Sequence, residues 1–484
     1  MSRTLFPTFA LLIFAATLAG CRSPGLASQT SRTSDDLQVA DRTPMPQDDR
    51  SDITLTSSEA EPAEAAPTAD PTLSEVAWSG EALTLAMLEQ WACENNPAIR
   101  QANAAVAKAM GFRDQVGRYP NPVAGYNASQ LADRGTDQHT AFVEQDIVRG
   151  KKLERNRLVL EQEVQAQLWQ VEMTRLRVIT DVRVRFYETL AAQRRVALAE
   201  SFEQVTARGV TVAQQRLDAL EGNRPELLQT RIQQSEVQLL RQKAEISFAA
   251  AWKSLFNVAG IPCATTGALA GSLALPLDAH DWETEYCQLE SISPEIRMAC
   301  SRVAASQANL QRQHAQPIPN LSLMVAGGYD NGTGSEMINT QIGMPIPLYN
   351  KNQGNIAAAW GEYCRATQEL ARLKLALRGR LIDAGRNYDG AAAEVRRYQR
   401  EILPTAEEAL TLSEQAFRAG ELEFLQVLIV RRTFFDANLA LVDAQSQFAQ
   451  ASSLVDGLLL SGSLTEATDT TADDSLRGQT LSGQ

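Results

Sequence analysis

The apolar positions along the chain follow one order of periodicities twice. A helical spacing of apolar residues gives way at a proline-containing joint to two short alternating segments, and a long helical hairpin pattern follows. The same order returns about 200 residues later, where Asn96-Pro97 is matched by Ser293-Pro294 and Gly222 by Gly420. A repeat of this length is too long for one unit of a solenoid. The pattern therefore predicts a duplicated structure with two equivalent halves.

Each half is expected to contain two β-strands. In the first half the alternation covers about 123–131 and 139–148, with Ala141, Val143, Gln145 and Ile147 on one face of the second strand. In the second half one strand begins near Leu321, and the other is expected to place five residues on one face: Ile338, Thr340, Ile342, Met344 and Ile346. Alternating segments of about ten residues with polar turns are typical of transmembrane β-barrel strands. A soluble hairpin would show the same alternation.

Prolines separate the predicted strands from the predicted helices. A proline inside a helix lacks the backbone N–H and its ring clashes with the preceding turn, so a helix ends before it. Six prolines are expected to form these helix–strand joints: Pro120, Pro122, Pro317, Pro319, Pro345 and Pro347.

The helical patterns that follow the strands are too long for a globular core. They cover about 150–220 and 225–258 in the first half, and about 354–418 and 421–460 in the second. Helices of this length are expected to pack as coiled-coil hairpins. Four strands cannot close a barrel, but three chains would supply twelve strands and a helical tube beneath them. The predicted fold class is mainly α, with a helical coiled-coil barrel and a transmembrane β-barrel portion of four strands per protomer.

The two ends of the chain differ in composition from its middle. Residues 1–20 have the apolar run of a signal peptide, and Leu18-Ala19-Gly20-Cys21 is typical of a bacterial lipoprotein cleavage site, where Cys21 receives lipid. An ordinary signal peptide with an incidental Cys21 is the alternative. The expected organisation is a signal peptide (1–20), a lipidated and disordered tether (21–72), a first repeat (73–262), a linker (263–282), a second repeat (283–460) and a disordered tail (461–484).

Charge and candidate chemistry exclude several functions. The formal net charge of −13 disfavours nucleic acid as a partner, since phosphate binding needs a concentrated basic face. The three histidines have no metal-ligand spacing, and the sequence shows no phosphate loop or nucleophile motif, so no enzyme, cofactor or metal site is predicted. Beside Cys21 there are five cysteines without a CxxC motif. A Cys263–Cys287 disulfide is possible, and buried, unpaired cysteines are the alternative.

Four motifs carry a resemblance to a known family: Glu94-Asn95-Asn96-Pro97-Ala98-Ile99, Tyr119-Pro120-Asn121-Pro122, Pro345-Ile346-Pro347-Leu348-Tyr349-Asn350-Lys351-Asn352-Gln353-Gly354-Asn355-Ile356 and Phe417-Arg418-Ala419-Gly420-Glu421-Leu422-Glu423-Phe424-Leu425-Gln426. With these the chain resembles the TolC-type outer-membrane efflux proteins, and among them the CzcC-like branch of cobalt–zinc–cadmium efflux. The resemblance covers about 83–460. It implies a homotrimer with a long periplasmic extension, a periplasmic adaptor as direct partner, and an RND-type, proton-driven inner-membrane pump as indirect partner. It also implies heavy-metal cations as substrates.

The resemblance places the two hairpin turns at the periplasmic tip, where the adaptor docks. Carried over by position, the docking residues are Leu217, Leu220, Gly222, Arg418, Gly420 and Leu422. A turn between antiparallel helices needs a residue with positive φ, and Gly222 and Gly420 are expected to supply it.

A ring of carboxylates near the tip is a further expectation. Threefold copies of acidic side chains could select cations, and the candidates are Glu200, Glu203, Glu407, Glu408 and Glu414. Solvated helix faces explain the same glutamates equally well.

Two other functions compete with metal efflux. The same type of channel could export drugs, other organic compounds or proteins, and no Met cluster or His-rich tract decides between these substrates. A lipid-anchored periplasmic coiled-coil scaffold without a channel is the third hypothesis. The proline-bounded strand pairs argue against the scaffold, because a pure coiled coil has no use for them.

Overall fold

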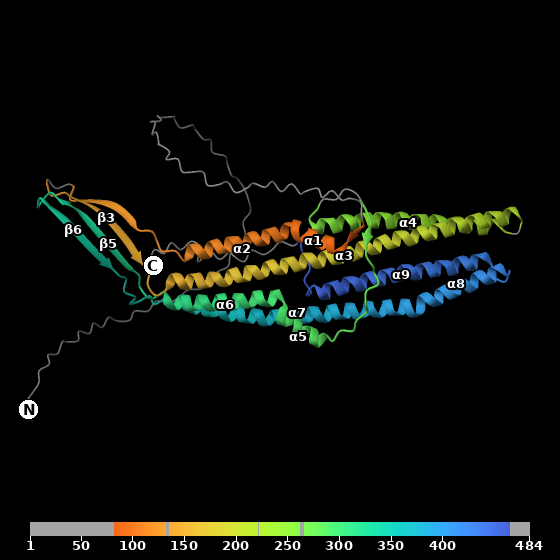
Figure 1. Cartoon of the computed structure of the whole chain (residues 1–484). Helices are drawn as coiled ribbons and strands as arrows, with labels where there is room; N and C mark the ends of the chain where they lie inside the picture. The colour runs from red at the N-terminus through yellow and green to blue at the C-terminus, as the bar shows by residue number, and fades with distance from the viewer. Residues whose placement is uncertain (1–81, 132–134, 221, 262–265, 465–484) are drawn as a thin grey trace, which may run out of the picture. The chain divides into compact units, whose positions relative to one another are not determined.

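A computed structural model describes residues 82–131, 135–220, 222–261 and 266–464. The predicted order of elements is confirmed in both halves (Figure 1). The first half runs through α1 (Leu85–Asn95), α2 (Pro97–Val116), β2 (Val123–Ser129), β3 (Gln138–Ile147), α3 (Lys152–Asp218) and α4 (Arg224–Ala259). The second runs through α5 (Trp282–Ile292), α6 (Pro294–Ala315), β5 (Leu321–Asp330), β6 (Ser335–Gly343), α7 (Gln353–Arg397), α8 (Leu403–Arg418) and α9 (Phe424–Asp456).

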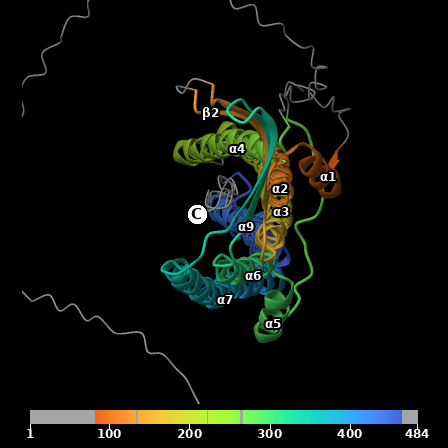
Figure 2. The same ribbon diagram turned by 90° about the vertical axis from the view of Figure 1, so that its left-hand side faces the viewer.

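Helix α3 is the element against which both halves pack. It contacts α2 and α4 of its own half and α6 and α9 of the other. Figure 2 looks along the helices and shows α4 and α7 on opposite sides, with α3 and α6 between them. The largest apolar core lies where α1, α3 and α4 meet, and Leu88, Phe186 and Trp252 are buried there. One long helix thus joins the duplicated halves along the length of the hairpins.

The helical pattern predicted one continuous helix over 354–418, and this is wrong in detail. Residues Tyr398–Ile402 form a π-helical turn between α7 and α8, two residues before Pro404. Proline lacks the N–H of the α-helical ladder and its ring presses on the preceding turn, and a π turn relieves that contact locally. Helix α3 has no proline and is uninterrupted over its 67 residues. The interruption therefore distinguishes the two halves.

Two short strands were not predicted. The strands β1 (Leu83–Thr84) and β4 (Leu269–Ala270) pair in parallel and join the start of α1 to the segment between the halves. Leu83 and Leu269 are both buried in the core beside α3. Two residues are too few to show a periodicity, so only tertiary packing reveals this pairing. Thr84 also caps α1, because its hydroxyl accepts from the Met87 amide.

The last predicted strand is shorter than expected. Strand β6 ends at Gly343, so Met344 and Ile346 lie beyond it. Pro345 has no N–H to donate to a strand ladder. The six prolines of the predicted joints all lie between helices and strands: Pro120 and Pro122 after α2, Pro317 and Pro319 after α6, and Pro345 and Pro347 before α7.

Candidate membrane sheet and hairpin tips

The strands of both halves form one antiparallel sheet in the order β2-β3-β5-β6. The halves are joined through β3 and β5, whose register runs from Gln138 opposite Asp330 to Ile147 opposite Leu321. Strands β2 and β6 each have a neighbour on one side only, so the sheet has two open edges within the described chain. Because adjacent strands alternate in direction, the two edge strands run in opposite directions.

The sheet has one apolar and one polar face, which follow from the register. The apolar sheet face includes Val143, Val325, Ile338 and Ile342, and these four side chains are exposed in the single chain. The polar sheet face includes Asn127, Thr140, Glu144, Asp146, Asn339 and Gln341. None of the four strands contains a Lys or an Arg. An exposed apolar face of this kind needs a lipid or protein surface to cover it.

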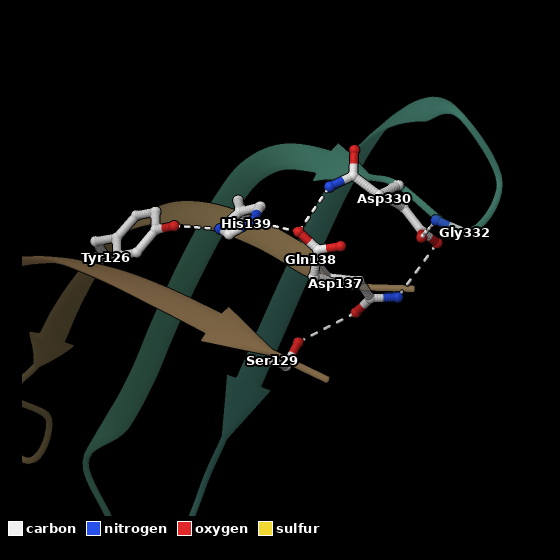
Figure 3. Close-up of polar contacts among 8 residues, drawn as sticks. Tyr126, Ser129, Asp137, Gln138, His139, Asp330 and Gly332 are labelled. Carbon is white, nitrogen blue, oxygen red and sulfur yellow. Dashed lines mark hydrogen bonds and ion pairs between the residues drawn. The ribbon is translucent and has the colours of Figure 1, made fainter. Parts of the chain in front are cut away.

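A hydrogen-bond network closes the end of the sheet (Figure 3) that is distant from the helices (Figure 1). The Asn331 side-chain amide donates to Asp137 Oδ2 over 2.7 Å, and the Asn331 backbone amide donates to the Asp137 carbonyl oxygen over 3.0 Å. His139 Nε2 also lies 2.7 Å from Asp137 Oδ2, and its Nδ1 meets the Tyr126 hydroxyl. The hydrogen bond from His139, followed by that from Asn331, lowers the pKa of the Asp137 carboxyl. The network ties the turn of one half to the turn of the other.

Close approach of β3 and β5 depends on Gly328, which was not predicted from the sequence. A Cβ added at Gly328 would overlap the backbone carbonyl oxygen of His139, whereas a Cβ at the adjacent Gly327 meets nothing within 4 Å. A glycine inside a strand pattern often marks such an approach, so the Gly327-Gly328 pair was the available signal.

The two hairpin turns lie at the same end of the helices and share one apolar cluster. The tip cluster contains Ala213, Leu227, Phe424 and Leu428, with Leu217 and Phe417 packed against it. The guanidinium of Arg216 lies 5.8 Å from the centre of the Phe417 ring and forms a 2.9 Å ion pair with Glu226. The structure therefore packs Leu217 of the first tip in one cluster with residues of the second, and Leu220, Arg418 and Gly420 are exposed at their respective tips.

The expectation that Gly222 has a positive φ is wrong. At the first tip Leu220 adopts the left-handed conformation, with φ 62°, and at the second tip Gly420 does so, with φ 77°. Gly222 instead comes close to the end of α3: its amide donates to the Arg216 carbonyl over 3.0 Å, and an added Cβ would lie 3.2 Å from the Leu217 amide nitrogen. The left-handed position falls two residues earlier, at Leu220, which directly follows Ala219, the C-cap of α3.

The five candidate gate carboxylates differ in their surroundings. Glu203 pairs with Arg241 of α4 at 2.8 Å, and Glu414 pairs with Arg431 of α9 at 2.8 Å, so both connect the two helices of a hairpin. Glu200, Glu407 and Glu408 are exposed. The paired glutamates are explained by hairpin packing alone.

Several sequence predictions lie outside the described residues. These are the signal peptide, Cys21, the N-terminal tether, the start of the linker, and the tail from 465 onward. Cys263 is also outside them, so a disulfide with Cys287 stays a prediction. In the described part of the chain, no helix is both long and apolar enough to cross a bilayer. The same residues contain no cluster of three or more metal-ligating side chains.

Two long helical hairpins that end in a four-stranded sheet with one apolar face are the architecture of an outer-membrane efflux channel protomer. Comparison with known proteins agrees: residues 286–459 match the family described as outer membrane efflux protein. The cobalt-zinc-cadmium resistance protein CzcC of Cupriavidus metallidurans is 26% identical over 275 residues, which are 57% of this chain and 65% of CzcC. The match thus spans less than two thirds of that relative's length.

Solved structures of outer-membrane channels share the fold. CusC superimposes with a TM-score of 0.66 at 18% identity, over 78% of this chain and 92% of CusC. The outer membrane protein VceC of Vibrio cholerae gives a TM-score of 0.63 at 18% identity, over 78% of this chain and 96% of VceC. The resemblance to the outer-membrane efflux proteins is therefore confirmed, and so is the predicted fold class.

Proposed function

We propose that this protein is the outer-membrane exit duct of a tripartite efflux pump and that it conducts substrates without catalysing a reaction. The observation that carries the proposal is the sheet, with its two open edges and one exposed apolar face. Backbone groups at a free edge cannot be satisfied in hydrocarbon, so a sheet enters a bilayer only as a closed barrel. Lipid would cover the apolar sheet face, and the polar sheet face would line the duct.

Three copies would close the barrel by pairing their edge strands. The edge strands β2 and β6 run in opposite directions, so β6 of one copy can pair antiparallel with β2 of the next. Each copy supplies four strands, and three give twelve, within the range of known outer-membrane barrels. The hairpins of the three copies would then form the tube that leads to the barrel.

The surface at the hairpin tips is the proposed docking site for a periplasmic adaptor, through which the duct would meet an RND-type inner-membrane pump. Leu220 is 92% exposed at the first tip, and Leu425 is exposed close to the second. Exposed apolar side chains beside a rigid cluster are typical of a protein interface. The variants Leu220→Glu and Leu422→Glu should each abolish efflux while the trimer in the outer membrane persists. Normal efflux in both variants would contradict docking at the tips.

Heavy-metal cations are the proposed substrates, an assignment that draws on the name of CzcC. The polar sheet face is consistent with cations, because it carries Glu144 and Asp146 and no basic side chain. Deletion of the gene should sensitise cells to cobalt, zinc or cadmium, and the intact gene should restore growth. Sensitivity to organic compounds alone, or a defect in protein secretion alone, would assign the duct to the other kinds of export.

Exposed carboxylates near the tip are proposed to favour cations at the entrance. Of the five candidates, Glu200, Glu407 and Glu408 lie open to solvent, whereas Glu203 and Glu414 are held by arginines. A variant with Glu200→Gln, Glu407→Gln and Glu408→Gln should be less selective for cations. Its reversal potential in a salt gradient should shift towards the value for anions. An unchanged reversal potential would leave these glutamates as solvated surface.

Lipidation of Cys21 is proposed as an additional anchor in the outer membrane. Several acyl chains hold a protein on a membrane where one is marginal. The mature protein should carry the mass of the attached acyl chains, and Cys21→Ser should lack it. If the masses of the mature wild type and Cys21→Ser differed only by the substituted atom, lipidation would be contradicted.

Planar-bilayer conductance of the purified protein, with its mass in the same detergent, tests the central proposal. Discrete openings from a trimer would support the duct. A trimer without openings would indicate a tip that is closed without its adaptor, and the adaptor should then open it. A monomer or dimer without conductance would contradict the barrel and favour the coiled-coil scaffold.

A further inference from the structure

A concentration of basic residues lies where the sheet meets the helices. Four joint segments, 113–122, 148–157, 311–320 and 344–353, contain nine Lys or Arg residues and two acidic ones. The adjoining strands contain no Lys or Arg, and the whole chain has a formal net charge of −13. This local reversal of charge coincides with the end of the sheet that faces the helices. We call these four segments the basic belt.

Side-chain contacts hold the four segments of the basic belt together. Lys152 Nζ donates to Asn320 Oδ1 over 3.2 Å, and Arg155 Nη1 donates to the Gln311 carbonyl oxygen over 3.0 Å. The first segment joins them through Gln145 at the end of β3, whose side-chain amide donates to the Pro120 carbonyl oxygen over 3.0 Å. The fourth segment is tied in by Asn352, whose side-chain amide donates to the Gln313 carbonyl oxygen over 2.8 Å.

The basic belt continues the apolar sheet face. Ile147 and Ile342 lie on that face, and two residues beyond them are Arg149 and Met344. The Arg149 guanidinium reaches Met344 Sδ at 3.8 Å, so it lies where the apolar surface ends. The exposed members of the belt are Arg118, Arg149, Lys151, Arg157 and Lys351.

Exposed aromatic and apolar side chains stand among these charges. Tyr349 is 93% exposed and Tyr119 is 71% exposed, and Ile346 and Leu348 are also exposed. Tyrosine has an apolar ring and a polar hydroxyl, and it gathers at the boundary between hydrocarbon and headgroups. An aromatic and basic rim beside an apolar surface has the chemistry of a membrane interface.

We infer that the basic belt binds the phosphate groups of anionic phospholipids in the leaflet that faces the periplasm. The inference rests on the proposed function, since the sheet must lie in a bilayer for the belt to reach headgroups. Guanidinium groups bind phosphate through paired hydrogen bonds, and basic side chains beside a membrane are attracted to anionic lipid. The belt would thereby fix the depth of the barrel and favour anionic lipid around the trimer.

The test measures which lipids the protein retains. Full-length protein is reconstituted in nanodiscs of mixed phosphatidylglycerol and phosphatidylcholine, extracted, and analysed for bound lipid by mass spectrometry. The belt variant carries Arg118→Gln, Arg149→Gln and Lys351→Gln. The matched control carries Arg208→Gln, Lys253→Gln and Arg400→Gln, which remove exposed charges from α3, α4 and the π-helical turn. Wild type and control should be enriched in phosphatidylglycerol relative to the nanodisc, with enrichment that falls as salt rises.

In the belt variant, the enrichment in phosphatidylglycerol should fall by about fivefold for each removed charge that contacted a headgroup. Equal enrichment in the belt variant and the control, or none in the wild type, would overturn the inference. Conductance of the same samples separates the two proposals. Open channels without phosphatidylglycerol enrichment would contradict only the lipid site, whereas failure of the wild type to insert at all would contradict the proposed function.

Discussion

Asn331 donates its side-chain amide to Asp137 Oδ2 over 2.7 Å, although the two residues are 194 positions apart in the chain. Each belongs to the strand-connecting turn of one half, so the contact joins the two halves at their turns. Together with the β3–β5 register it makes two hairpins into one four-stranded unit. A barrel built from three such units requires each unit to hold its register.

Asn331→Ala should loosen this end of the sheet. It removes the hydrogen bond to Asp137 and leaves the strands intact, so the free energy of unfolding should fall by about 1 kcal/mol. Thermal unfolding of the purified protein measures the loss. Asn339→Ala on the polar sheet face is the control, because within the described residues its side-chain amide contacts Met337 Sδ alone. Equal losses in both variants would show that the turn contact contributes nothing specific.

Acid should weaken the same contact. The pKa of Asp137 is lowered in the folded protein, so its carboxylate stabilises the fold above the ordinary carboxyl pKa of about 4. That contribution is lost as the pH falls through the lowered folded value. The thermal midpoint of Asp137→Asn should therefore lie below that of the wild type at neutral pH and approach it in strong acid. A difference between the two proteins that is constant with pH would contradict this.

Gly328→Ala should prevent the sheet from forming. A Cβ at Gly328 would overlap the His139 carbonyl oxygen, and its three nearest atoms all belong to the backbone of His139 and Thr140, so no flexible side chain could move aside. Trimer and conductance should both be lost. Gly327→Ala is the matched control, since a Cβ there meets nothing within 4 Å. Trimers of normal conductance from Gly328→Ala would mean that the β3–β5 approach is wider than the structure shows.

Leu220→Gly should keep or raise stability. Leu220 has φ 62° and is 92% exposed, so glycine removes backbone strain of about 1 kcal/mol without loss of packing. Leu412→Gly is the control, because Leu412 is an exposed residue inside α8, where glycine costs about 1 kcal/mol. Chemical denaturation of both variants decides the point. A destabilised Leu220→Gly would show that the Leu220 side chain contributes at the tip.

Pro404→Ala should stabilise the second hairpin. Alanine restores an N–H to the helical ladder and removes the ring, so the π-helical turn over Tyr398–Ile402 should shorten or disappear. A higher thermal midpoint and a straighter helix in a structure of the variant are the expected results. The uninterrupted α3 shows that the equivalent helix of the first half needs no such turn. A π turn that persists without Pro404 would assign it to packing against α9.

Sequence periodicity was enough to predict the elements of both halves and their order. The alternation near Val143 and the helical spacing after Gly150 are local properties, because each depends on which side of one element is covered. The proline joints and the Thr84 cap are local as well, since they involve hydrogen bonds within a few residues. The exposed apolar sheet face was also visible in the sequence as a period of two.

Only the tertiary structure decided how these elements meet. The pairing of β3 with β5, the short β1–β4 ladder and the cluster shared by both tips all join residues that are far apart in the chain. A periodicity shows that a face will be covered, but it does not show which partner covers it. The left-handed conformation of Leu220, which was expected at Gly222, is instead a local feature of the C-terminal end of α3, and the glycine pattern placed it two residues too late. The sequence by itself therefore determined the parts, and packing between distant segments determined their contacts.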